Sequence, residues 1–173
     1  MSVDIKENFL EPGVFRALHG MLCLDTFPWY FSKVVSYKDE LEDGIRKNIT
    51  CKDSFNQQFV HGVYNNYRIR SNIFDIFEPV FEEMDIKSLI RIKINLNPRT
   101  EKVIEHGLHI DSYVDSTTSI LYMNTNDGYT KFEDGTKIES KENRLITFPS
   151  SMYHTGTTCT DDPGRIVINF NYF

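Results

Sequence analysis

A histidine and an aspartate stand two positions apart in the segment His109-Ile110-Asp111. In an extended chain, side chains two residues apart point to the same side. An imidazole nitrogen and a carboxylate oxygen at this spacing can therefore bind one metal ion. Short patterns of this kind arise often by chance, and the alternative interpretation is a surface aspartate beside a hydrogen-bonded histidine at a strand end.

A second histidine, His154, comes just before a late predicted strand. Two histidines and one carboxylate on one face of an octahedron leave three positions open, which is the arrangement of non-haem iron(II) oxygenases. His106 competes with His109 as a ligand by spacing alone. On a strand, however, an offset of three places the two side chains on opposite faces. We therefore interpret His106 as a neighbour of the site or a surface residue.

An arginine, Arg165, follows His154 by eleven residues (165 − 154) and begins the last predicted strand. A guanidinium group is planar, permanently charged and able to bind a carboxylate through two parallel hydrogen bonds. Buried, it would hold an anion. The alternative is a surface arginine that forms an ion pair with Asp161 or Asp162.

Together these residues resemble the H-x-D…H…R pattern of the 2-oxoglutarate/iron(II) oxygenases. Thr118–Asn124, with the sequence TSILYMN, resembles the strand after H-x-D in the prolyl-4-hydroxylase-like branch, where T-x-x-x-Y-L-N is common. Arg144–Ser150, with the sequence RLITFPS, resembles the strand that leads to the distal histidine. The resemblance is good over residues 89 to 173 and extends to small oxygenase-like proteins encoded by bacteriophages.

The resemblance implies an active dioxygenase. Iron(II) would be held by His109, Asp111 and His154, with 2-oxoglutarate and O₂ as co-substrates and ascorbate as an in vitro additive. The implied reaction hydroxylates a C–H bond and releases succinate and CO₂. The substrate would be a peptidyl side chain or a small molecule. The alternative from another class is a non-catalytic jelly-roll binding module that keeps the oxygenase scaffold.

The resemblance also assigns the residues that hold 2-oxoglutarate. Arg165 and Tyr122 match the groups that bind its 5-carboxylate. Many relatives carry a serine or threonine two residues after the arginine, where this chain has Val167. Tyr122 or Thr118 would then supply the missing hydroxyl.

Three further polar residues alternate with apolar ones on a predicted strand: Lys93, Asn95 and Asn97. One interpretation is a solvated face of the sheet. The other is that they line the barrel interior and contact the substrate.

The strands that must position these residues occupy the second half of the chain. The period-two pattern and Gly-containing turns predict eight of them, at about 89–97, 103–108, 118–124, 129–133, 136–139, 144–148, 153–158 and 165–172. Apolar residues at helical spacing predict earlier helices that begin at about Pro12 and Asn72, the second divided by Pro79. A further strand is expected within Tyr30–Tyr37.

The predicted fold is mainly β: a double-stranded β-helix, or jelly roll, with N-terminal helices packed on one face. We expect a single oxygenase domain over residues 1–173. Within it, residues 1–88 form a helical and mixed support region, and residues 89–173 form the jelly-roll core with the site. The 13 Phe and 9 Tyr of the chain suit a β-rich protein.

Composition bears on partners and compartment. The net charge of −6 argues against a protein that binds nucleic-acid phosphates, which needs a basic face. The start Met1-Ser2-Val3-Asp4 shows no secretory signal, and no apolar run approaches the ~20 residues of a membrane span. Three cysteines without C-x-x-C spacing predict neither a disulfide framework nor a thiolate zinc site. The expected location is the cytoplasm, that of the host if the chain is phage-encoded.

Overall fold

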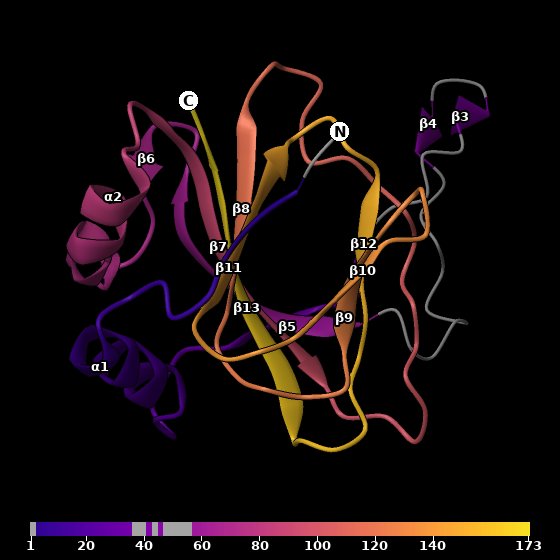
Figure 1. Cartoon of the computed structure of the whole chain (residues 1–173), viewed down its shortest axis with the longest axis horizontal. Helices are drawn as coiled ribbons and strands as arrows, with labels where there is room; N and C mark the ends of the chain where they lie inside the picture. The colour runs from indigo at the N-terminus through magenta and orange to yellow at the C-terminus, as the bar shows by residue number, and fades with distance from the viewer. Residues whose placement is uncertain (1–2, 36–40, 43–44, 47–56) are drawn as a thin grey trace.

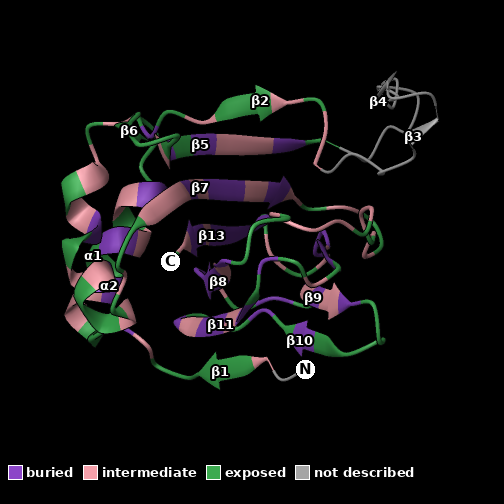
Figure 2. Ribbon diagram, turned by 90° about the horizontal axis from the view of Figure 1, so that it is seen from above, coloured by how far each residue is buried: buried purple, intermediate pink, exposed green. Residues whose placement is uncertain are grey.

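The computed structural model describes residues 3–35, 41–42, 45–46 and 57–173. Most of its strands belong to one antiparallel sheet in the order β1-β11-β8-β13-β7-β5-β2, with β6 paired to β5 (Figure 2). A smaller sheet has the order β10-β9-β12, and β3 pairs with β4. The strands are β1 (Asp4–Lys6), β2 (Tyr30–Ser32), β3 (Leu41–Glu42), β4 (Ile45–Arg46), β5 (Gln58–Asn65), β6 (Arg68–Ile69), β7 (Leu89–Pro98), β8 (Thr117–Tyr122), β9 (Tyr129–Phe132), β10 (Lys137–Glu139), β11 (Arg144–Pro149), β12 (His154–Gly156) and β13 (Gly164–Tyr172).

The pleat of the large sheet sorts its side chains into two apolar clusters. On β8, Leu121 packs on the side of the helices, whereas Ile120 and Tyr122 pack toward the small sheet. Phe132 of the small sheet completes the second cluster. Two antiparallel sheets thus face each other across a core (Figure 1), which is the predicted jelly-roll arrangement.

Two helical segments contribute to the other cluster. Helix α1 (Pro12–Leu22) begins at Glu11, whose carboxylate accepts hydrogen bonds from the backbone N–H groups of the first turn. The predicted second helix is divided: a 3₁₀ turn, η1 (Phe74–Phe77), is followed by α2 (Glu78–Met84), which has Pro79 in its first turn. Both segments pack apolar side chains against the same cluster as β7, β8 and β13.

Strand β7 has an apolar and a polar side, and this difference creates the site. Ile92 and Ile94 are fully buried in the cluster beneath the helices. Arg91, Lys93 and Asn95 alternate with them and line a cavity on the other side of the sheet. The strand is therefore buried on both faces, but only one face is packed with apolar side chains.

Several predicted boundaries were wrong. The strand expected at 103–108 does not form; among the described residues this segment has one isolated bridge, between Glu105 and Thr157. The Thr158 hydroxyl accepts the hydrogen bond of the Ile104 N–H. A side-chain acceptor thus takes the place of a backbone carbonyl in the expected strand pairing. Conversely, β1 and β5 were not predicted. β5 contains Gly62, and its sequence lacks clean alternation.

Of the strand expected within Tyr30–Tyr37, the residues Tyr30–Ser32 form β2. The last two residues of the expected range lie outside the described part of the chain. No helix in the described part of the chain is both long and apolar enough to cross a membrane.

Candidate metal centre

Two histidines from distant parts of the chain are joined by their backbones. The N–H of His109 donates to the carbonyl of His154, and the N–H of His154 donates back, both at 2.9 Å. The two imidazole ring centroids consequently lie 4.6 Å apart. Asp111 is held beside them because its own N–H donates to the Ser150 carbonyl at 3.0 Å.

Each imidazole is oriented by a backbone carbonyl two residues before it. Nδ1 of His109 lies 3.1 Å from the Gly107 oxygen, and Nδ1 of His154 lies 3.0 Å from the Met152 oxygen. A hydrogen bond from Nδ1–H to a carbonyl fixes the tautomer in which Nε2 carries a lone pair. Both rings are therefore prepared to bind a metal ion through Nε2.

Three donors hold the carboxylate of Asp111. Oδ1 accepts from Nη2 of Arg91 at 2.9 Å. Oδ2 accepts from Thr118 Oγ1 at 3.0 Å and from Asn171 Nδ2 at 3.1 Å. A carboxylate offers about four lone-pair positions, so one remains for a metal ion.

The electrostatics of the cluster favour the ligand forms of its side chains. Burial raises the pKa of Asp111, but Arg91, His154 and His109 together with the Asn171 hydrogen bond hold it well below its usual range. Burial and the neighbouring His109 lower the pKa of His154 to about 4, against an opposing effect of Asp111. Near neutral pH the cluster therefore holds an ionised carboxylate beside a neutral His154, the forms that bind metal ions.

One ligand atom from each of His109, Asp111 and His154 lies within 4.8 Å of the others. Two imidazoles and one carboxylate fit iron(II) in both donor type and number. The structure thus brings together all three residues that the sequence predicted as ligands.

Arg165 extends into the same cavity from the start of β13 and is buried. Its Nε donates to Ser140 Oγ at 2.7 Å, and its Nη2 donates to Thr130 Oγ1 at 3.1 Å. No carboxylate in the described part of the chain forms an ion pair with it. The alternative pairing with Asp161 or Asp162 is therefore not observed, and the buried charge lacks an anion.

A tyrosine and a threonine complete the surroundings of this guanidinium. Tyr122 is fully buried, its ring centroid lies 5.4 Å from the Arg165 guanidinium carbon, and its hydroxyl donates to Thr130 Oγ1 at 2.7 Å. Burial raises the pKa of Tyr122, which keeps the phenol protonated. Because Thr130 accepts two hydrogen bonds, its own O–H is available to donate into the cavity that it lines.

Thr118 and Val167, the other residues considered for 2-oxoglutarate binding, lie in different parts of the site. Thr118 Oγ1 donates to Asp111 Oδ2 and also lies 2.9 Å from Ser150 Oγ, so its hydroxyl belongs to the Asp111 end of the site. Val167 lines the cavity. Sequence reasoning missed Thr130 and Ser140, because their approach to Arg165 depends on the register of β9 and the path of the chain after β10.

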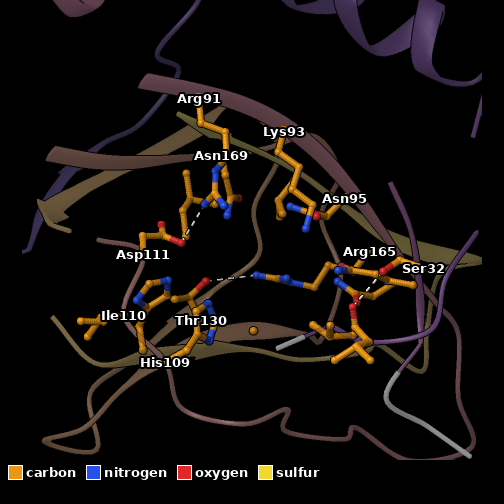
Figure 3. Close-up of a pocket in the computed structure, with 18 residues that line it drawn as sticks. Ser32, Arg91, Lys93, Asn95, His109, Ile110, Asp111, Thr130, Arg165 and Asn169 are labelled. Atoms are coloured by element: carbon orange, nitrogen blue, oxygen red, sulfur yellow. Dashed lines mark hydrogen bonds and ion pairs between the residues drawn. The ribbon is translucent and has the colours of Figure 1, made fainter. Parts of the chain in front are cut away.

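The cavity has a volume of about 450 Å³, within the range of roughly 300–1,000 Å³ that is usual for small-molecule sites. Lys93, Asn95 and Asn97 all line it, as do Arg91 and Asn169, which the sequence did not single out as pocket residues. Figure 3 shows the side chains of Arg91, Lys93, Asn95 and Asn169 extending from β7 and β13 toward the cavity that Asp111 and Arg165 share.

His106 does not belong to the ligand cluster. It is largely buried, and its Nε2 has no hydrogen-bond partner in the described part of the chain. Burial, with the charges of Arg165 and His109, lowers its pKa to about 4. Of the two interpretations of His106, neighbour of the site or surface residue, this position favours the first.

Comparison with solved structures identifies the fold. The chain resembles a viral collagen prolyl hydroxylase of Paramecium Bursaria Chlorella virus-1, solved as a 2OG complex, with a TM-score of 0.62 and 11% identity over 99% of this chain and 95% of that one. It resembles a Trichoplax adhaerens prolyl hydroxylase, in complex with a hypoxia inducible factor peptide, with a TM-score of 0.64 and 16% identity over 99% and 83%.

A third similar structure is the non-heme alpha ketoglutarate dependent epimerase SnoN from nogalamycin biosynthesis, with a TM-score of 0.65 and 10% identity over 99% of this chain and 77% of that one. No protein-family model and no curated protein sequence matches the chain. At these identities the comparisons establish the fold alone, which the chain shares with these three structures.

Close packing around Arg165 gives a first prediction. A Cβ atom added at Gly128 would lie 2.7 Å from Cδ of Arg165 and 2.8 Å from the Thr158 carbonyl oxygen. Gly128→Ala should therefore lower the free energy of unfolding by about 1–3 kcal/mol through overpacking, measured by urea denaturation. Gly20→Ala is the control, because its Cβ meets no atom within 4 Å. Unchanged stability of Gly128→Ala would contradict this packing.

Proposed function

We propose that the chain is an iron(II)- and 2-oxoglutarate-dependent dioxygenase that hydroxylates a C–H bond of its substrate. One observation carries the proposal: a His-Asp-His cluster and a buried arginine, which has no acidic partner among the described residues, line the same cavity. The fold shared with known oxygenases supports it. Bound iron(II) and 2-oxoglutarate would supply an oxidation that is coupled to the release of succinate and CO₂.

In this proposal His109, Asp111 and His154 hold the iron. The two carbonyls that accept from Nδ1 keep both Nε2 atoms free of protons. Arg91, Thr118 and Asn171 fix the carboxylate so that one lone pair remains. Such outer contacts orient metal ligands before the ion arrives.

Arg165 would bind the 5-carboxylate of 2-oxoglutarate, with Tyr122 packed against it. Thr130 supplies the hydroxyl that relatives carry two residues after the arginine, because its O–H is available to donate. Val167 leaves the space beside it apolar. A buried guanidinium with hydroxyl partners but no anion among the described residues is costly, so binding of an oxyanion there gains both charge pairing and hydrogen bonds.

The substrate is proposed to be a peptidyl side chain or a small molecule. One of the similar structures is a complex with a peptide, and another is an enzyme of nogalamycin biosynthesis. We further propose one domain over residues 1–173, because β1, β2 and β5 complete the sheet that carries the site.

The ligand assignment predicts that one divalent ion binds per chain. His109→Ala, Asp111→Ala and His154→Ala should each weaken iron(II) or manganese(II) binding by at least about a hundredfold, since each removes one of three protein ligands. Calorimetric titration under anaerobic conditions measures this, with His19→Ala in α1 as the histidine control. Wild-type affinity in folded Asp111→Ala would contradict the assignment.

The anchor assignment predicts that Arg165→Met weakens 2-oxoglutarate binding by about tenfold to a thousandfold. Arg165→Lys should recover only part of the loss, because an ammonium group lacks the two-bond fork. The absorbance of the anaerobic iron(II)–2-oxoglutarate complex gives the affinity, and exposed Arg99→Met is the control. Unchanged 2-oxoglutarate binding in Arg165→Met would mean that another basic residue, such as Lys93, binds the 5-carboxylate.

The experiment that tests the function is succinate production from 2-oxoglutarate in air with iron(II) and ascorbate. Wild type should turn over slowly alone and faster with a substrate from a panel of peptides and metabolites. His154→Ala should show only background. No excess succinate from wild type across the panel would favour the non-catalytic binding module. Equal succinate from both proteins would show that free iron did the chemistry.

A further inference from the structure

Lys93 is a cation in the cavity for which the proposed chemistry has no use. It extends from β7 toward the cavity (Figure 3) and forms no ion pair with a carboxylate of the described residues. The nearest candidate, Asp111, already accepts a hydrogen bond from Arg91. Burial and the charge of Arg91 lower the pKa of Lys93 to about 8, against a smaller opposing effect of Asp111. The amine is thus still mainly protonated at pH 7.

Two amides beside Lys93 each have an oxygen without a hydrogen-bond partner among the described residues. Asn95 follows it by two residues on the same side of β7, and Asn169 is its register partner on β13. The Oδ1 atom of each is buried without a hydrogen bond, and neither side chain donates one to a described residue. An amide group has two donors and one acceptor oxygen, and leaving it unpaired in a buried place is costly. The surroundings of Lys93 are therefore prepared for a polar guest.

The charges of the cavity with metal and 2-oxoglutarate bound indicate the charge that a substrate should carry there. This step rests on the proposed function. Arg165 would be balanced by the 5-carboxylate of 2-oxoglutarate. A divalent metal ion would be balanced by Asp111 and the 1-carboxylate. Among the described residues that line the cavity, no further acid then compensates the cations of Arg91 and Lys93. Like charges this close and partly buried favour binding of an anion between or beside them.

We propose that the substrate of this oxygenase carries an oxyanion, a carboxylate or a phosphate group, that pairs with Lys93 and accepts hydrogen bonds from the Nδ2 groups of Asn95 and Asn169. The oxyanion fixes the substrate on the β7 side of the cavity. A C–H bond near that group then faces the metal ligands. Cationic and purely apolar compounds of the same size are excluded by the charge of Lys93 and the unpaired amides.

The test uses binding to the protein loaded with manganese(II) and N-oxalylglycine, an unreactive analogue of 2-oxoglutarate. The probes are matched pairs: N-acetylated amino acids as free acids and as carboxamides, and sugar phosphates with their dephosphorylated sugars. Calorimetry should show at least one charged probe binding about tenfold or more tightly than its neutral counterpart. The carboxylate and phosphate pairs show which oxyanion the cavity prefers.

Lys93→Met should abolish this preference, and Lys93→Arg should retain part of it because the charge remains. Lys102→Met is the matched control: Lys102 is exposed and does not line the cavity, so the variant should keep the preference. Asn169→Leu, which keeps the lysine, should weaken the charged probes several-fold and thereby tests the amide contact separately.

Two outcomes would overturn the inference while leaving the proposed function in place. One is a loaded wild-type protein that binds no charged probe better than its neutral counterpart. The other is a preference for anions that survives in folded Lys93→Met. A wild-type protein that takes up neither manganese(II) nor N-oxalylglycine would overturn the proposed function as well, so the two failures are distinguishable.

Discussion

The site depends on two backbone hydrogen bonds, those that join His109 and His154. They form one of two isolated bridges between the segment before β8 and the segment after β11. Without them the two imidazoles would belong to separate loops. These two bonds are made by the backbone. Further contacts then orient the ligand side chains: the Nδ1 contacts, the three donors to Asp111 and the packing of Phe148 against the His154 ring. The metal cluster is thus a consequence of strand pairing more than of loop conformation.

The large sheet has a mainly polar face on β7 and β13, where an ordinary β-sandwich has an apolar one. On β7 and β13 the residues that face the small sheet are mainly polar, and Arg165 is buried among hydroxyls and no acids of the described chain. A core of this kind gives up apolar burial on one side of two central strands. The compensating packing lies on the opposite face, where Ile92, Ile94 and Phe170 are fully buried beneath the helices. The helical segments therefore stabilise a sheet whose other face is left free for ligands.

The sequence predicted those parts of the site that are encoded locally. His109 and Asp111 are two residues apart, and His154 and Arg165 flank one strand connection, so spacing and resemblance sufficed. It did not predict Thr130, Ser140 or the bond from Arg91 to Asp111, because each depends on which strands pair and in which register. The strand expected at 103–108 was wrong for a related reason: Thr158 supplies a side-chain acceptor where the period-two pattern implied a ladder. Alternation along β7 was predicted correctly, but whether its polar face meets water or a cavity is a property of the whole sheet.

Charge connects the two ends of the cavity. Asp111 is the only acid among the described residues that line it, whereas Arg91, Lys93 and Arg165 all do. Arg91 balances Asp111 in the protein alone, and its hydrogen bond keeps the carboxylate ionised and oriented. A metal ion that binds Asp111 shares that negative charge with Arg91, so each cation added to the cavity strengthens its attraction for anions. Entry of the metal should therefore favour binding of a dianionic co-substrate, and the positive charge that remains near Lys93 favours an anionic substrate next. With the proposed ligands, these charges favour entry of the metal ion before either anion.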